Sequence, residues 1–435
     1  MADDPTPDPS SPISPASSPA PSEARARRPV YEPSLLPART RRRAPRWVVV
    51  PILLVVLLGA LYLVLGGGHP RRFVATANTL VWASDEGTPG TPHLWRAALD
   101  GSGARRLSHA AAAETQPAFS PDGSQIAYVS PVSGSPQVFV MDADGQNPQQ
   151  VTRNAGAKQQ PLFAPSDSSL LAYVSGGAVS TVGIINSDTS RLLPPAPDPA
   201  ATAQSDALIN SPTVIVNDFH WAPGKEPSAQ ALAAREETAD LQALVVQPSL
   251  GGKARDTQSA QPNSPPLAAA DAVTLGWSPS GSLLAAALLG VKGLPPGRAL
   301  SAIALFDRDG SPAGQKPLAL TANAITGPQF PVFSPDGTQI AFELWQQPNL
   351  AHAHCLGLFT VAVDGGTPPR PLAPGDARLA HWTPDGQSVL FLRQRAGGGS
   401  DLWRVGANGT GLTRLSDGTA DVSWFSVSPQ GEPSP

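Results

Sequence analysis

The stretch HAHC, which ends at Cys355, combines side chains that bind transition metals. In an extended segment His352 and His354 would face one side and Cys355 the other, and no second Cys or His cluster supplies the remaining ligands of a zinc site. DADG at 142–145 and DRDG at 307–310 lack the further acidic ligands of a calcium loop. The sequence therefore predicts no metal and no cofactor, and both Asp-Gly motifs are expected to be turns.

Polar side chains precede each copy of a repeated turn, and such carboxylate, amide and imidazole groups could bind a cation, a sugar or a peptide terminus. These candidate ligand-binding residues are Glu114, Gln116, Gln160, Asp218, His220, Asp271, Gln329, Asp376, Arg378, His381 and Asp421. They would ring the mouth of a central channel. The alternative is that they only solvate that channel.

Recognised catalytic patterns are missing from the sequence. Gly-x-Ser-x-Gly, His-Glu-x-x-His and phosphate-binding glycine loops do not occur. This favours a non-catalytic protein. The alternative that stays open is a cation-dependent hydrolase or lactonase whose site is built from carboxylates at the channel mouth.

The elements that must position these residues come from a repeat. FSPDGSQIAYVS at 119–130 nearly recurs as FSPDGTQIAFEL at 333–344. Pro presets φ at the first turn position, Asp bonds its own backbone and Gly accepts a positive φ, so each copy predicts two strands joined by a tight turn. Related turn signals begin at Ser120, Ala164, Ala222, Ser278, Ser334, Thr383 and Ser428, spaced by 44, 58, 56, 56, 49 and 45 residues.

Each unit continues with a second apolar run, an Asp-Gly type turn and a short fourth strand. Four antiparallel strands at this period predict an all-β propeller. Seven blades are expected, and six is the alternative because the units at 163 and 221 are degenerate. The unit at Thr79 to Ser108 lacks a first strand and 422–431 supplies one, so the C-terminal strand should close the ring over 79–431.

The unit of an aromatic residue, Ser-Pro-Asp-Gly, Ile-Ala and Phe or Tyr, followed by a strand ending in Asp-x-Asp-Gly, resembles the TolB-type β-propeller repeat, a WD40-like Pro-Asp repeat. The resemblance covers nearly all of 79–431 and implies the propeller fold. For function it implies a docking scaffold, a ligand-binding body or the gating domain of a peptidase. The chain is expected to depart from TolB by lacking the α/β domain before the propeller, since about a dozen residues separate the predicted membrane span from the first strand.

Aromatic side chains recur directly before the turns. They are Phe119, Phe163, Trp221, Trp277, Phe333 and Trp382. Identical placement in each unit predicts packing between blades rather than a carbohydrate platform.

Insertions are expected on only one rim of the ring. The first-to-second and third-to-fourth connections of each unit are tight turns on one rim, whereas the insertions at 194–213, 254–272, 290–301 and 345–355 fall on the other. Loops often carry function, so a partner or ligand is predicted on the looped rim. The alternative is that these insertions have no function and are tolerated, because longer loops cost little stability.

The first 78 residues predict a membrane anchor. Residues 1–46 are a Pro, Ser and Arg-rich tail that should be disordered, 47–66 form a transmembrane helix, and 67–78 are a short linker. Eight Arg precede the apolar span and two follow it closely, so the N-terminus should be cytoplasmic. A cleaved signal peptide is the alternative.

From Phe73 onward the chain has 20 Lys and Arg against 29 Asp and Glu, a formal charge of −9, which argues against a nucleic-acid partner. With one cysteine no intrachain disulfide can form. The leading expectation is a non-catalytic, single-pass protein of the bacterial cell membrane. Its extracytoplasmic propeller would bind an envelope protein, a cell-wall component or a small molecule at the looped rim.

Overall fold

The computed structural model describes residues 78–429 with gaps at 133, 188, 194–214, 224–231, 238–241, 248–254, 257–270, 292–299, 310, 312, 314–317, 322–325 and 347–353. The predicted tail, membrane helix and linker lie outside these residues, as does most of each predicted insertion. The chain divides into Met1–His69 and Pro70–Pro435, and everything below concerns the second unit. Within its described part, no helix is long and apolar enough to cross a membrane.

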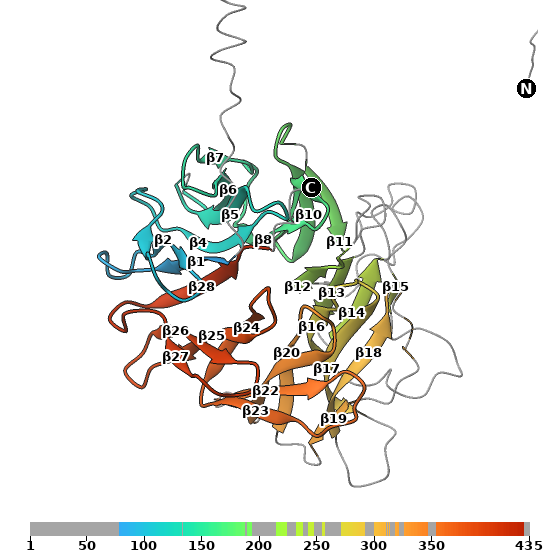
Figure 1. Ribbon diagram of the computed structural model, residues 1–435. Helices are drawn as coiled ribbons and strands as arrows, with labels where there is room; N and C mark the ends of the chain where they lie inside the picture. Colours follow the sequence, from blue (N-terminus) through green and yellow to red (C-terminus); the bar gives the residue numbers. More distant parts are fainter. Residues whose placement is uncertain are drawn as a thin grey trace, which may run out of the picture. The chain divides into compact units, whose positions relative to one another are not determined.

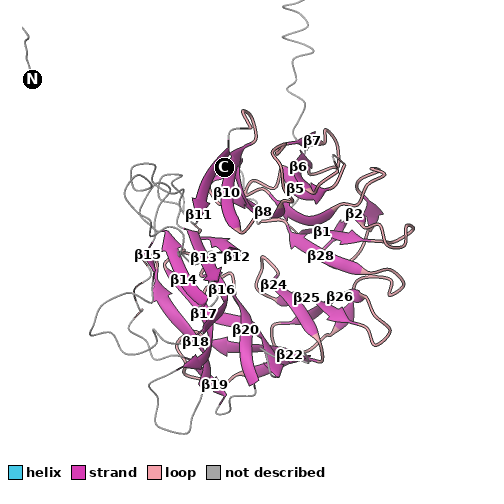
Figure 2. Cartoon of the chain, turned by 180° about the vertical axis from the view of Figure 1, so that it is seen from behind, coloured by secondary structure: helices cyan, strands magenta, loops and turns pink. Residues whose placement is uncertain are grey.

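Seven four-stranded antiparallel sheets make up the described chain, each a blade around a common centre (Figures 1 and 2). Blade 1 contains β28 (Val422–Val427), β1 (Thr79–Ser84), β2 (His93–Ala98) and β3 (Arg105–Arg106). Blade 2 contains β4 (Thr115–Phe119), β5 (Gln125–Ser130), β6 (Gln137–Asp142) and β7 (Gln149–Gln150). Blade 3 contains β8 (Gln159–Ala164), β9 (Asp167–Ser175), β10 (Ala178–Gly183) and β11 (Thr189–Leu193). The propeller prediction is confirmed, and the blade number is the seven expected from the repeat.

The remaining four blades follow in chain order. Blade 4 contains β12 (Ile215–Trp221), β13 (Leu232–Glu237), β14 (Gln242–Gln247) and β15 (Arg255–Asp256). Blade 5 contains β16 (Asp271–Trp277), β17 (Leu283–Val291), β18 (Leu300–Asp307) and β19 (Leu318–Thr321). Blade 6 contains β20 (Thr326–Phe333), β21 (Gln339–Gln346), β22 (His354–Ala362) and β23 (Arg370–Pro374). Blade 7 contains β24 (Ala377–Trp382), β25 (Ser388–Gln394), β26 (Ser400–Gly406) and β27 (Thr413–Arg414).

The ring closes where the two ends of the propeller meet. β28 pairs antiparallel with β1, with Phe425 opposite Trp82. Ser428 extends the pairing, since its N–H donates to the Thr79 carbonyl at 2.9 Å and its Oγ accepts from the Thr79 N–H at 3.0 Å. Blade 1 is therefore built from both ends of the described chain, as its incomplete repeats predict.

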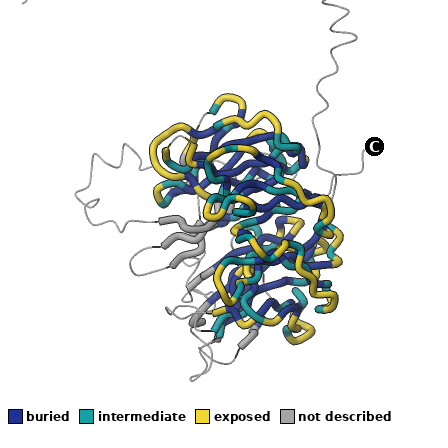
Figure 3. The backbone as a smooth tube through the Cα atoms, turned by 90° about the vertical axis from the view of Figure 1, so that its left-hand side faces the viewer, coloured by how far each residue is buried: buried dark blue, intermediate teal, exposed yellow. Residues whose placement is uncertain are grey.

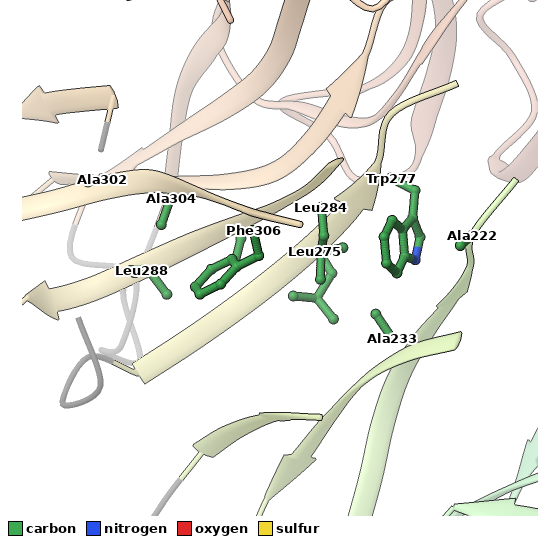
Figure 4. Packing of buried hydrophobic residues seen from close by; sticks show 10 residues of the cluster. Ala222, Ala233, Leu275, Trp277, Leu284, Leu288, Ala302, Ala304 and Phe306 are labelled. Atoms are coloured by element: carbon green, nitrogen blue, oxygen red, sulfur yellow. The ribbon is translucent and has the colours of Figure 1, made fainter. Parts of the chain in front are cut away.

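The core lies between neighbouring blades, where buried strands face one another (Figure 3). The six aromatic residues that precede the turns are all buried there. Trp277 of blade 5 shows the arrangement, because it packs against Ala222 and Ala233 of blade 4 (Figure 4). The prediction of inter-blade aromatic packing is confirmed.

Each tryptophan at this position also bonds to the preceding blade, which the sequence pattern did not reveal. Trp382 Nε1–H donates to the Val332 carbonyl at 3.0 Å, and Trp277 Nε1–H donates to the His220 carbonyl at 3.1 Å. Trp221 makes the corresponding bond to Leu162 at 3.4 Å. A buried indole N–H needs an acceptor, and the inner strand of the neighbouring blade supplies it.

The two kinds of tight turn lie at the same end of each blade, because connections one-to-two and three-to-four of an antiparallel sheet must do so. We call this end the tight-turn face and the opposite end the looped face. Gly281 shows why a turn needs glycine: its φ is +66°, and a Cβ there would lie 2.0 Å from the Pro223 carbonyl oxygen of blade 4.

Candidate functional site

Three predicted site residues belong to a bulge that recurs in the inner strands. Register shifts interrupt the pairing of β4, β8 and β20 with their neighbours, and Gln116, Gln160 and Phe330 there have positive φ values. The Gln160 N–H donates to Gln116 Oε1 across the blade boundary at 2.7 Å. Gln329, buried in the β20 bulge, completes the group. Gln116 thus has a structural role in joining blades 2 and 3.

The most developed surface cluster lies between blades 6 and 7, on the looped face. Arg378 Nε lies 3.2 Å from Asp376 Oδ1, and its side chain is 45% exposed. The guanidinium carbon lies 5.1 Å from the centre of the Trp345 ring, a cation–π distance. Gln394 Oε1 accepts a further bond from Arg378 at 3.2 Å. Two predicted residues, Asp376 and Arg378, are therefore brought together, and the sequence analysis missed Trp345.

A buried carboxyl lies beneath this cluster. Glu343 is 1% exposed, its Oε2 accepts from Trp345 Nε1 at 2.9 Å, and its Oε1 is buried without a hydrogen bond. Burial raises the pKa of Glu343 to about 8, although the Trp345 indole, the Leu379 backbone amide and Arg378 oppose the rise. Five other blades place Ala83, Val129, Val174, Ala287 and Leu392 at this strand position, all of them buried. Blade 4 has Arg235 there. Comparing the repeats would have singled out Glu343.

Asp421 lies at the junction of blades 7 and 1, also on the looped face. Its Oδ1 accepts from the Ser400 N–H at 2.6 Å, and its own N–H donates to Asp85 Oδ1 at 2.7 Å. Backbone donors, with that of Gly90 foremost, lower the pKa of Asp85. These carboxylates hold the loops that flank the closing strand.

Glu114 does not lie exposed at a channel mouth. It is 1% exposed between blades 1 and 2, where Ser108 Oγ–H donates to its Oε2 and His93 Nδ1 lies 3.6 Å away. Burial raises the pKa of Glu114 and lowers that of His93, so both groups favour the neutral form. The serine donates to the glutamate rather than to the histidine, and all three side chains are buried, so this trio is not built for nucleophilic catalysis.

His381 and His220 occupy equivalent inner-strand positions. The His381 ring meets Phe425 edge-on, with centroids 5.4 Å apart, and lines a pocket on the tight-turn face. Enclosure by protein atoms, and to a lesser extent His220, lowers the pKa of His381. Because the imidazole keeps an exposed surface, we expect a small shift. The side chains of Asp218 and Asp271 lie outside the description.

The HAHC stretch divides as its alternation predicts. His354 is exposed, whereas Cys355 is buried and burial raises the pKa of its thiol to about 12. His352 lies outside the described residues. Where the chain is described, no three His, Cys, Asp or Glu side chains gather to hold a metal ion.

Comparison with known proteins adds the following. The family model of the TolB beta propeller domain matches residues 68–194. No curated protein matches the sequence. Similar solved structures include a putative TolB from Agrobacterium tumefaciens, with 18% identity, a TM-score of 0.41 and coverage of 62% of this chain and 84% of that one. TolB from Acinetobacter baumannii has 13% identity, a TM-score of 0.46 and coverage of 86% and 71%.

Oligogalacturonate lyase from Vibrio parahaemolyticus is also similar, with 12% identity, a TM-score of 0.49 and coverage of 79% of this chain and 85% of that one. Likenesses at these identities and TM-scores carry no argument for an activity. The TolB beta propeller domain model thus matches residues 68–194 of this chain, and four-stranded blades continue from there to β28.

Proposed function

We propose that the protein is a non-catalytic, membrane-anchored scaffold whose looped face docks a protein partner, centred on the interface between blades 6 and 7. The observation that carries the proposal is the exposed Arg378 stacked on Trp345. Arg and Trp are enriched among the residues that dominate binding energy at protein interfaces. An Arg already held by Asp376 and Gln394 also loses less freedom when a partner binds.

The buried Glu343 also supports a docking site at the interface between blades 6 and 7. Glu343 bonds to the indole of Trp345, the ring on which Arg378 stacks. A buried carboxyl is costly unless it is protonated or well bonded, and the equivalent position is apolar in five other blades. The fold of a scaffold does not require a glutamate at position 343. A fixed orientation of the Trp345 ring does require it, because Glu343 accepts the indole hydrogen bond.

The anchor and its orientation are part of the proposal. The charge-free stretch from Trp47 to Leu65 and the eight preceding Arg support a span with a cytoplasmic N-terminus and a propeller on the outer side, in a bacterial cell envelope. Protease treatment of intact cells should degrade the propeller and spare a tag at the N-terminus. Protection of the propeller would reverse the assignment.

The docking proposal is tested with a photo-crosslinking residue at Gln394, which is exposed on the looped face. The probe removes the Gln394 bond to Arg378 but leaves Asp376 and Trp345 to hold the guanidinium. A matched probe at Thr410 is exposed on the tight-turn face of the same blade. We expect a protein adduct from position 394 that Arg378→Ala abolishes and that is not formed from position 410. Adducts that are equal at both positions, or that survive Arg378→Ala, would refute the docking site.

The alternative hydrolase or lactonase requires a divalent cation. Thermal unfolding with calcium, with zinc and with EDTA distinguishes the two functions, because a ligand that binds only the folded state raises its stability. A melting temperature that calcium, zinc and EDTA leave unchanged agrees with the scaffold function. A metal-dependent shift would favour the enzyme.

A further inference from the structure

A pocket of about 320 Å³ opens on the tight-turn face, at the ends of the inner strands and away from the looped face. Its walls include Pro279, Pro335 and Pro384 from the turns of blades 5, 6 and 7, and Pro429, which follows β28 of blade 1. The Trp382 and His381 side chains add to the lining. Four proline rings and an indole make a mostly apolar site of fixed shape.

Stacking of successive turns builds this pocket. A Cβ at Gly337 of blade 6 would lie 3.8 Å from Pro279 of blade 5, and one at Gly386 of blade 7 would lie 3.7 Å from Pro335 of blade 6. Each turn therefore rests on the proline of the preceding turn. Because prolines have fixed φ and no flexible side chain, the pocket is pre-organised and little order is lost on binding.

Carboxylates are frequent in the turns of this face. The acidic residues in the described tight turns are Asp100, Asp122, Asp144, Asp309, Asp336, Asp364 and Asp385. Among the described residues of these turns Arg308 is the one cation, and it is bonded to the Pro223 and Gly281 carbonyls at 3.0 and 2.9 Å, whereas Arg105 and Arg370 begin the strands that follow two of the turns. A bond from Ser334 Oγ lowers the pKa of Asp336, so that carboxylate stays charged at neutral pH.

Asp385 beside Pro384 behaves in the same way. Burial alone would raise its pKa, but bonds from Thr383 Oγ1 and the Gln387 N–H outweigh burial and lower the pKa. Two exposed carboxylates thus flank prolines of the pocket. Arg404 of β26 also lies near enough to Asp385 to lower its pKa. The two carboxylates favour a cationic over an anionic ligand.

We propose that this pocket binds a basic segment of a protein partner, which inserts one apolar side chain between the proline rings. The apolar walls account for the inserted side chain, and the carboxylates account for flanking Lys or Arg. This second binding surface is independent of the one proposed on the looped face.

The test uses the full chain and a fluorescent peptide with one Trp between two runs of three Lys. We expect saturable binding by anisotropy, weakened at least tenfold when the Trp is replaced by Gly and abolished when the Lys are replaced by Glu. The double variant Asp336→Asn, Asp385→Asn should weaken binding three- to tenfold at low ionic strength and less at high salt. Asn keeps the side-chain oxygen that accepts the turn hydrogen bonds, so the fold should be retained.

Asp417→Asn is the matched control. Asp417 makes the same kind of turn bond, to the Thr419 N–H at 2.9 Å, but lies in the β27–β28 connection on the looped face. It should leave peptide affinity unchanged. A benzophenone in place of the peptide Trp should crosslink to segments containing Pro279, Pro335 or Pro384, which keeps the test valid if a variant fails to fold.

Several results would overturn the proposal. They are equal affinity of the Trp and Gly peptides, equal effects of the Asp417 control and the double variant, or crosslinks outside the pocket. Self-association of the chain that the double variant abolishes would assign the pocket to a second copy instead. Failure here would leave the Gln394 crosslinking result intact, since that experiment probes the opposite face.

Discussion

The interface between blades 4 and 5 and the interface between blades 6 and 7 use the same strand positions with different chemistry. At the first, Trp277 packs against Ala222 and Ala233 within an apolar cluster. At the second, Trp382 packs similarly, but Glu343 is buried at a position that is apolar in five other blades. Repeated blades therefore provide internal controls, and a departure such as Glu343 is a reason to look for function.

The largest expected effect on stability comes from a substitution that disrupts the apolar interface between blades 4 and 5. Trp277→Ala should lower the free energy of unfolding by about 3–5 kcal/mol, because the small alanines of blade 4 cannot fill the cavity. Guanidinium denaturation followed by circular dichroism measures the change. Exposed Val132→Ala is the control and should change stability by less than about 0.5 kcal/mol. A loss under about 1 kcal/mol for Trp277→Ala would contradict inter-blade packing as the main role of this residue.

The second effect on stability concerns Glu343 at the interface between blades 6 and 7 and depends on pH. The folded-state pKa of Glu343 is raised from 4.5 to about 8, so its protonated form stabilises the fold below pH 4.5 and that contribution is lost as pH rises to about 8. We expect a decline of about 2–4 kcal/mol across this window that is missing in Glu343→Gln. Denaturation at pH 5, 6, 7 and 8 measures it.

Glu343→Leu sharpens the same experiment, because Leu392 occupies the equivalent position in blade 7. This variant should be pH-independent in the window and, at pH 8, as stable as the wild type or more so. His93 and His381 have lowered pKa values and destabilise the fold as pH falls, which is the opposite direction. Identical pH profiles of wild type and Glu343→Gln would refute the burial of a protonated carboxyl.

A smaller effect is common to both interfaces. Trp382→Phe and Trp277→Phe each remove an indole bond to a carbonyl of the preceding blade. Each should cost about 1–2 kcal/mol, since the carbonyl is left without its donor. Thermal unfolding of the two variants should agree closely. A large difference between their melting temperatures would show that the indole bond does not contribute equally to the two interfaces.

The smallest effect on stability should accompany the largest effect on partner binding. Arg378→Ala removes an exposed ion pair and a stacked guanidinium, which contribute at most about 1 kcal/mol. Arg393→Ala is the matched control, because Arg393 lies 5.4 Å from the Trp403 ring centre. Both variants should melt within a few degrees of the wild type, while Arg378→Ala alone loses the Gln394 crosslink. Loss of the crosslink in both would point to general disturbance of blade 7.

The sequence alone determined the propeller, the tight turns and the aromatic packing, because Ser-Pro-Asp-Gly chemistry and strand alternation act within a dozen residues and recur. It also predicted that β28 would complete blade 1, since the first unit lacks one strand and the C-terminal segment supplies a strand without a unit of its own. The membrane anchor and the partner stay predictions. Glu114 was placed wrongly at a channel mouth, because its burial depends on Ser108 and His93 of the neighbouring blade.

Only the tertiary structure decided which polar residues meet. Trp345 and Glu343 lie on β21 of blade 6 and Arg378 lies on β24 of blade 7, so their meeting depends on how the two blades pack. The pocket on the tight-turn face likewise needs the turns of blades 5, 6 and 7 to stack on one another beside the end of β28. Local rules shape each turn, whereas the site that several turns form together depends on how the closed ring packs its blades.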